Sequence, residues 1–536
     1  MHRRSSTRRI GVGVAVAGGL LAAALVPAPA GAAPDQTGCD NRNNNTYEKL
    51  LECVRLEGVR AHQAALQEIA DENGGTRAAG TPGYDGSVEY VVDTMEAAGW
   101  TVTLHEFPFV FVPPPTLRQL TPITADYETG AFTGTGYGEV QGNVIPVDIN
   151  LVPPRASTSG CEPADFTGLD FSGPADIALI QRGTCPFADK ALNAEAAGAE
   201  AVIIFNQGDT PTRTDLIIGT LGGLDIVAIP VVGASFADGE ALAQPGSTAY
   251  VNVDQPEDRP QVNVLAELPG TNDDNVVMAG AHLDSVQRGP GIQDNGTGSA
   301  ALLEIGQQLS KLRPQNTLRL AWWGAEEAGL IGSTQYVNGL SQTERDRIAL
   351  YLNFDMIGSP NYFFGVYDAD QSSFPAPMGV PIPEGSEAIE DTFESFYTLR
   401  GEPYDDSEFS GRSDYQAFIL NGIPSGGLFT GAEVVKTPEQ QAIWGGTAGQ
   451  QFDPCYHLRC DTFDNISLHA LEVNSDAVAF AVLTYAYSTQ AVNGVPGTRV
   501  PGNFRIPAEP AGPEHTFAGP LGGEGPHDHD HEEVPS

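Results

Sequence analysis

Histidine and carboxylate side chains recur at the ends of short apolar runs in the stretch from Ala279 to Asp355. They are His282 with Asp284, then Asp294, the pair Glu326 and Glu327, and Asp355. Apolar runs bounded by glycine and polar residues predict buried strands of an α/β sheet. Ligands of open α/β sheets bind beyond the carboxyl ends of the strands. We therefore expect these side chains to share one site.

Histidine together with carboxylates is a ligand set typical of zinc. A hydrolase that acts on an amide needs a strong nucleophile near neutral pH and stabilisation of oxyanion charge, and zinc supplies both. Two zinc ions about 3.5–4 Å apart can share one carboxylate, with a water between them. Each ion then needs one further histidine and one further carboxylate. With the distant His457 included, the chain has a set for two Zn²⁺ ions: His282, His457, Asp294, Glu327 and Asp355.

Two acidic neighbours are candidates for supporting roles. Asp284 lies two residues after His282, so both would point to the same face of a strand, where the carboxylate could accept the second ring N–H. Adjacent side chains at a strand end diverge, so Glu327 could bind metal while Glu326 acts as general base. Each motif alone has a simpler interpretation as a surface pair, a solvated face or a turn. Their joint occurrence at strand ends favours the metal site.

The motifs AHLDS, Asp294-Asn-Gly, Glu326-Glu327-x-Gly, NFDMIG and Tyr456-His457 together resemble the M28 family of di-zinc aminopeptidases, in particular its secreted leucine-type members. The resemblance covers roughly Val59–Phe109 and Gln261–Ala491. It implies an α/β zinc-peptidase fold in which helices flank a mixed central β-sheet. The zinc ligands it implies are His282, Asp294 as the bridge, Glu327, Asp355 and His457.

The resemblance also implies roles for three further residues. Glu326 would be the general base, and Tyr456 would hydrogen-bond the developing oxyanion. Arg412, in the motif SGRSDY, would lie near the substrate-binding end of the site. The implied reaction is hydrolysis of N-terminal residues, large and hydrophobic ones such as leucine, by a water that bridges the metals.

A second domain is expected between residues 117 and 258. The composition becomes Pro-rich at Val110–Pro115, and the polar stretch DQPEDRPQ ends the region. Within it, the apolar runs IALI and AVIIF flank an Ala-rich helical segment, a pattern that resembles the mostly-β protease-associated (PA) domain inserted in M28 enzymes. The region has no His/carboxylate cluster, so we expect it to be non-catalytic. A role as a lid and a purely architectural role are both open.

Two other functions stay open on the residues alone. Arg412 could bind a substrate carboxylate, which would make the protein a di-zinc carboxypeptidase or another amidohydrolase. A PA-bearing binding protein with an inert metal site is the third hypothesis, and the complete ligand set argues against it. Calcium binding is also open, but it cannot be assigned to residues, because no loop of the type D-x-[DN]-x-[DN]-G occurs.

The N-terminus predicts export. Four arginines precede the apolar run Ile10–Val26, and A-x-A cleavage sites follow, which is typical of a secretory signal. No other run reaches membrane length, and the net charge of −42 argues against nucleic-acid binding. We therefore expect a secreted, extracellular protein without a membrane anchor, a monomer whose partners are peptide substrates.

The expected organisation has five parts. They are a signal peptide at 1–33, the N-terminal part of the catalytic domain at 34–116, the PA insert at 117–258, the main catalytic part at 259–491, and a disordered Pro/Gly/His-rich tail at 492–536. Within them we expect helices over Tyr84–Ala98, Ala388–Tyr397 and Leu468–Ser488, a loose Asp35–Asn45 segment, and alternating strands and loops over Met356–Pro403.

Six cysteines in an exported chain predict three disulfides, for which fifteen connectivities exist. We expect the three local pairs Cys39–Cys53, Cys161–Cys185 and Cys455–Cys460. The last pair would brace the loop that carries Tyr456 and His457.

Overall fold

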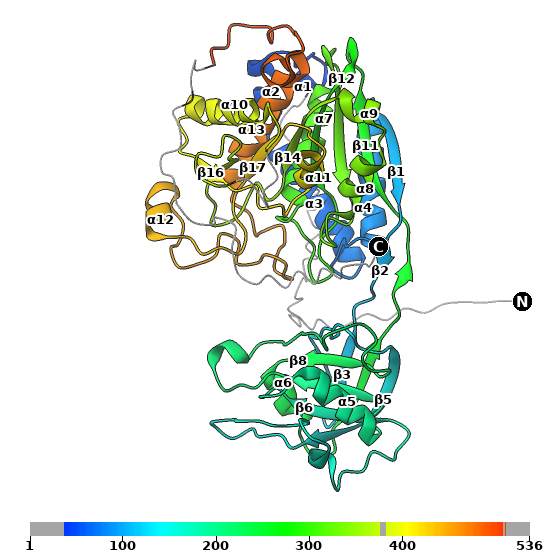
Figure 1. Ribbon diagram of the computed structural model, residues 1–536. Helices are drawn as coiled ribbons and strands as arrows, with labels where there is room; N and C mark the ends of the chain where they lie inside the picture. The colour runs from blue at the N-terminus through cyan, green and yellow to red at the C-terminus, as the bar shows by residue number, and fades with distance from the viewer. Residues whose placement is uncertain (1–36, 376–381, 507–509, 511–536) are drawn as a thin grey trace, which may run out of the picture.

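The computed structural model describes residues 37–375, 382–506 and 510. The predicted signal peptide and the histidine-rich C-terminal end lie outside these residues. Figure 1 shows a larger main domain above a smaller inserted domain, joined by two chain segments that run side by side. The segments pair as a short ribbon of β2 (Val110–Phe111) and β10 (Glu257–Asp258).

The main domain is built on a mixed eight-stranded sheet. Its strands, in spatial order, are β1 (Thr101–Phe107), β11 (Gln261–Leu268), β13 (Asn316–Trp323), β12 (Asn272–His282), β14 (Ile348–Phe354), β17 (Ser425–Phe429), β15 (Gly365–Tyr367) and β16 (Asp405–Ser407). The four central strands β13, β12, β14 and β17 are parallel, while β1, β11 and β15 join antiparallel neighbours. The parallel centre brings the carboxyl ends of four strands to one edge.

Helices cover both faces of this sheet. One face packs against α2 (Tyr47–Cys53), α3 (Leu56–Glu72), α4 (Pro82–Ala97), α7 (Gly296–Leu309), α10 (Ser386–Arg400) and α13 (Leu468–Tyr487). The other packs against α8 (Ile331–Gly339) and α11 (Tyr415–Leu420), with α9 (Gln342–Arg347) beside β12 and β14. Side chains of a strand alternate between faces: Val277 and Ala279 of β12 enter the first core, whereas Val276 and Met278 enter the second. Burial on both faces explains why these strands are continuous apolar runs.

The inserted domain has its own seven-stranded sheet. Its strands are β4 (Ala125–Tyr127), β3 (Thr116–Thr121), β9 (Thr248–Val253), β5 (Gly138–Val147), β6 (Asp176–Gln181), β7 (Ala201–Phe205) and β8 (Val231–Ala234). The helices α5 (Phe187–Ala197) and α6 (Phe236–Leu242) pack on it, each contributing to a separate apolar core. The sheet begins at Thr116 and ends at Val253, within a few residues of the expected insert.

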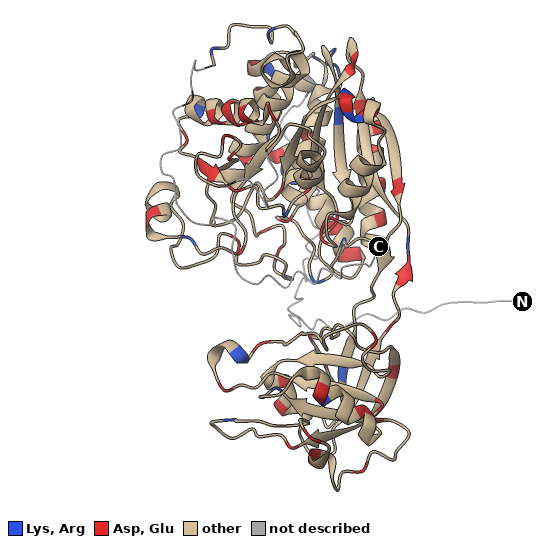
Figure 2. Ribbon diagram, in the orientation of Figure 1, with Lys and Arg blue, Asp and Glu red and all other residues tan. Residues whose placement is uncertain are grey.

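The expected helices near 84–98, 388–397 and 468–488 are present as α4, α10 and α13. The structure also contains the three expected local disulfides, Cys39–Cys53, Cys161–Cys185 and Cys455–Cys460. Acidic residues occur along the ribbon of both domains, and basic residues are fewer (Figure 2). Within the described ranges, no helix combines the length and apolarity that crossing a membrane requires.

Three expectations about local structure are wrong in part. The segment before Asn45 is not wholly loose, because it contains the short helix α1 (Thr37–Asp40). Between 356 and 403 the described residues form only β15 and α10. The tail does not lose its packing at 492: Val492 is buried, and the Phe504 ring lies 5.1 Å from that of Tyr47. The Pro/Gly-rich composition of this segment predicted disorder, but the segment also contains apolar side chains that pack against the core beside α13.

Candidate active site

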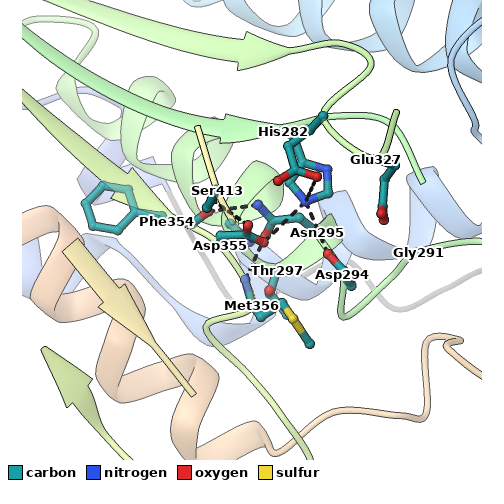
Figure 3. A network of polar contacts seen from close by, with 12 residues as sticks. His282, Gly291, Asp294, Asn295, Thr297, Glu327, Phe354, Asp355, Met356 and Ser413 are labelled. Carbon is teal, nitrogen blue, oxygen red and sulfur yellow. Dashed lines mark hydrogen bonds and ion pairs between the residues drawn. The ribbon is translucent and has the colours of Figure 1, made fainter. Parts of the chain in front are cut away.

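The predicted site residues meet at the carboxyl edge of the main sheet. His282 is the last residue of β12, while Glu326 and Glu327 follow β13 and Asp355 follows β14 directly. These three strands are parallel neighbours, so their ends lie side by side. Asp294 enters from the loop before α7, as Figure 3 shows.

The aspartate predicted as a bridge lies between the two histidines. Asp294 Oδ1 is 3.1 Å from His282 Nε2, and its Oδ2 is 3.2 Å from His457 Nε2. On one side, His282 Nε2 also lies 3.2 Å from Asp355 Oδ1. On the other, His457 Nε2 lies 3.0 Å from Glu327 Oε2. The structure thus brings all five predicted ligands into two groups that share Asp294.

These distances fit a pair of zinc ions. Zinc binds histidine nitrogen and carboxylate oxygen at about 2.0–2.1 Å, so two ligand atoms of a tetrahedral ion lie about 3.3 Å apart. The four histidine–carboxylate separations of 3.0–3.2 Å are close to this edge length. Among the described residues, the buried Oε1 of Glu327 has no hydrogen-bond partner, so this oxygen could bind metal as well. Each group offers one histidine, one carboxylate of its own and one shared carboxylate.

At or beside three of the site residues, the backbone is left-handed at a residue other than glycine. Ala325 before Glu326, Met356 after Asp355, and His457 itself have φ of 54°, 55° and 57°. This region is sparsely populated for residues other than glycine and persists only where the surroundings enforce it. Asn295 contributes such a constraint: its side chain donates to Phe354 O and accepts from Met356 N, which ties the start of α7 to the end of β14 (Figure 3).

Asp284 supports the site in a different way from the one expected. The ring Nδ1 of His282 lies 3.1 Å from the main-chain oxygen of Asp284, and the carboxylate is 3.7 Å away, beyond hydrogen-bond distance. The carboxylate instead accepts the amides of Glu326 and Glu327, at 3.2 and 3.3 Å. The main-chain carbonyl orients the histidine, and the carboxylate holds the turn of the two glutamates.

Two neighbours of the ligands were missed in the sequence. Ser413 donates to Asp355 Oδ2 at 2.6 Å, which leaves Oδ1 toward His282. Asp461 accepts the amides of Gln293 and Asp294 at 2.8 and 3.0 Å. Ser413 follows Arg412 in SGRSDY, and Asp461 follows Cys460, so both were adjacent to residues already singled out.

Electrostatics at the site follow from burying several carboxylates together. Burial, with repulsion from Asp355, Asp414 and Glu327, raises the pKa of Glu326 well above its usual value despite the facing His282. Burial lowers the pKa of His457, but the attraction of Glu327 and Asp294 outweighs it and raises that pKa to about 10. A cluster of carboxylates that favours the charged form of His457 would also attract a metal cation.

A cavity opens beside the ligands. Its walls include apolar side chains (Leu330, Met356, Tyr367, Phe429 and Ala432) and polar ones (Glu408, Arg412, Glu433 and Tyr456). Arg412 Nη1 donates to Glu433 Oε1 at 2.8 Å, and its Nη2 donates to the Tyr456 hydroxyl oxygen at 3.1 Å. The predicted Arg412 and Tyr456 therefore face the same cavity as the ligands.

A second group of carboxylates lies around α10, outside this site. Its members are Asp368, Asp370, Glu390, Glu394 and Asp406. Burial, together with the neighbouring Asp370, raises the pKa of Glu390 to about 9. Burial and Asp406 likewise raise the pKa of Glu394 to about 7.

Comparisons with known proteins agree with this geometry. Residues 263–482 match peptidase family M28, and residues 140–242 match the PA domain. An aminopeptidase from Pseudomonas aeruginosa is 47% identical over 453 residues, which cover 83% of each chain. Leucine aminopeptidase 2 from Trichophyton rubrum is 37% identical over 460 residues, 84% of this chain and 88% of that one.

A solved structure is similar as well. The zinc aminopeptidase from Bacillus subtilis superposes with a TM-score of 0.54 at 26% identity, covering 80% of this chain and 94% of that one. The family match at residues 263–482 includes the parallel centre of the main sheet and all five predicted metal ligands. The chain therefore belongs to peptidase family M28 and is a metallo-aminopeptidase with an inserted PA domain.

Proposed function

We propose that this protein is a secreted di-zinc aminopeptidase that removes large hydrophobic residues from the N-termini of peptides. The observation that carries the proposal is the position of Asp294, whose two oxygens face two histidines of separate ligand groups. His282 and Asp355 would hold one ion, and His457 and Glu327 the other. Zinc held there supplies Lewis acidity, which activates water near neutral pH and polarises a carbonyl.

We propose that Glu326 moves the proton. Its Oε2 lies 4.0 Å from His282 Nε2, and its side chain is 8% exposed at the wall of the cavity. The Asp284 carboxylate holds its main-chain amide, which orients the side chain toward the ligands. We assign Glu326 Oε2 to accept the proton of the attacking water and to deliver it to the leaving amine.

We propose that Tyr456 stabilises the oxyanion. A guanidinium can only donate hydrogen bonds, so in the contact with Arg412 the tyrosine oxygen is the acceptor. The hydroxyl hydrogen of Tyr456 therefore remains available to donate into the cavity. Such a preorganised donor is most effective where charge develops in the transition state.

The cavity supports recognition of an N-terminal residue. The carboxylates of Glu326 and Asp355 both face it and could bind an α-ammonium group. The apolar walls formed by Leu330, Met356 and Phe429 suit a large hydrophobic side chain. Arg412 already donates to Glu433 and Tyr456, which argues against its use for a substrate carboxylate and against a carboxypeptidase.

Export is supported by two features. The first 33 residues have the pattern of a secretory signal. All six cysteines are disulfide-bonded, as is usual for proteins that fold in an oxidising compartment.

The deciding experiment is hydrolysis of Leu-p-nitroanilide before chelation, after chelation, and after zinc is returned. Loss of activity that zinc restores supports the proposal, with two zinc ions per chain expected by metal analysis. Activity only on an N-acylated peptide with a free C-terminus would replace it by a carboxypeptidase. A protein that binds no zinc and hydrolyses neither substrate would be an inert relative.

A further inference from the structure

Arg77 is a fully buried cation just before α4, with 0% of its surface exposed. Its guanidinium binds three main-chain carbonyls, each through a different nitrogen. Nη1 donates to Leu283 O, Nε to Pro290 O at 2.8 Å and Nη2 to Gly291 O at 2.6 Å. The carboxyl groups of Asp284, Asp461 and Asp294 attract its charge, but none of the described carboxylates forms an ion pair with it. All three hydrogen bonds of the guanidinium therefore go to the main chain of one segment, residues 283–291.

That stretch is the loop between two predicted zinc ligands. Leu283 directly follows His282, and Gly291 lies three residues before Asp294. The main chain of Arg77 adds a further contact, because its amide donates to Ser285 Oγ at 2.9 Å. Arg77 thus joins the two ends of the loop that separates one histidine ligand from the bridging aspartate.

The side chain of Asp461 also holds this loop. Asp461 accepts the amides of Gln293 and Asp294, while Arg77 binds the carbonyls at the preceding positions. Gly291 O also accepts the amide of Gly296, the first residue of α7. In the backbone that leads into Asp294, both main-chain N–H groups and main-chain carbonyl groups are therefore hydrogen-bonded.

The backbone conformation at Gly291 leaves room for the planar guanidinium of Arg77. Gly291 has φ of +62°, and a Cβ at this position would lie 2.4 Å from Asp294 O and 3.2 Å from Arg77 Nη2. A guanidinium offers five donors in a rigid plane, whereas lysine concentrates its charge and donors at a single nitrogen. Lysine could therefore replace the charge of Arg77 but not the simultaneous contacts to both ends of the loop.

We infer that Arg77 is a positioning residue for the metal centre, which sets the separation of His282 and Asp294 through their connecting loop. This inference rests on the proposed di-zinc function. Partners that orient metal ligands typically contribute 10–100-fold to metal affinity. A purely structural role would lower the melting temperature while leaving the zinc affinity of the folded protein unchanged.

The test measures zinc dissociation constants by competition with a chromophoric chelator, on protein whose near-UV circular dichroism confirms the folded state. Arg77→Met is expected to weaken zinc binding by about 10–100-fold. Arg77→Lys should give an intermediate loss, and it keeps the proposal testable if the methionine variant does not fold. Arg319→Met is the matched control, because Arg319 is a partly buried arginine that pairs with Glu267 and contacts no part of this loop.

Arg319→Met should reduce stability and bind zinc with wild-type affinity. The inference is overturned if either Arg77 variant folds and binds both zinc ions within twofold of the wild type. A wild-type protein that binds no zinc would instead overturn the proposed function. The two failures are therefore distinguishable.

Discussion

Replacing Tyr456 with phenylalanine removes one hydroxyl group and leaves the ring in place. The Tyr456 oxygen accepts from Arg412 Nη2 at 3.1 Å, so its hydrogen is the group available to an oxyanion in the cavity. Loss of one preorganised oxyanion donor lowers kcat by about 10²–10³, or about 2.7–4 kcal/mol. We expect this loss in kcat with little change in KM, because the interaction strengthens only in the transition state.

The assay is steady-state hydrolysis of Leu-p-nitroanilide by zinc-loaded wild type and Tyr456→Phe. Zinc content should be equal in the two, since the hydroxyl is not among the proposed ligands. A double-mutant cycle with Arg412→Met then tests whether Arg412 acts through the hydroxyl. Arg412→Met should lower kcat in the wild-type background and have a much smaller effect once the hydroxyl is gone.

Two results would refute this reasoning. A Tyr456→Phe enzyme with kcat within threefold of wild type would mean that the hydroxyl does not stabilise the transition state. An equal effect of Arg412→Met in both backgrounds would mean that Arg412 acts independently of Tyr456, for example through Glu433. Glu433→Gln is the control that separates these cases, because it removes the charge partner of Arg412 and leaves the tyrosine contact.

Three further predictions concern single side chains. Glu326→Gln should lower kcat by about 10²–10⁴ while both zinc ions stay bound; near-normal turnover would remove Glu326 as the base. Asp461→Asn replaces one acceptor oxygen by an NH₂ group, which would face the main-chain N–H of Gln293 or Asp294 without forming a hydrogen bond. Chelator competition should therefore show zinc binding weakened by about 10–100-fold, whereas wild-type affinity would contradict this prediction. The pKa of Glu390 is about 9 in the folded protein and about 4.5 in the unfolded chain. The contribution of Glu390 to the free energy of unfolding is therefore fully present below pH 4.5 and is lost as the pH rises toward 9. Urea unfolding at pH 5, 7 and 9 should therefore show that the free energy of unfolding falls less with pH in Glu390→Gln than in the wild type. At pH 9 the variant should be more stable by about 1–3 kcal/mol, and an equal pH dependence in the two proteins would refute this prediction.

Several features of the site were predictable because they depend on local sequence. His282, Glu326, Glu327 and Asp355 follow apolar runs, and a run buried on both faces of a parallel sheet is recognisable without knowledge of its neighbours. The adjacent parallel order of β13, β12 and β14 then brings those ends together. The disulfides were predictable for a similar reason, since their sequence separations are only 14, 24 and 5 residues.

Features that depend on distant contacts could not be predicted. Phe504 packs against Tyr47 although its segment is Pro/Gly-rich. A few apolar side chains are enough to hold such a segment where helices already present an apolar surface. Ser413 reaches Asp355 across 58 residues of sequence. Composition and periodicity carry no information on such pairs.

The sequence by itself determined which chemical groups this protein brings to its site: two histidines, the carboxylates and the tyrosine, placed at strand ends and in one disulfide-closed loop. Only the tertiary structure decided how those groups are held. It assigned the orientation of His282 to the Asp284 carbonyl rather than to its carboxylate, and it brought Arg77 to a loop 206 residues away. The physical reason is that ligand identity follows from side-chain type, whereas ligand geometry depends on hydrogen bonds between segments that meet only after folding.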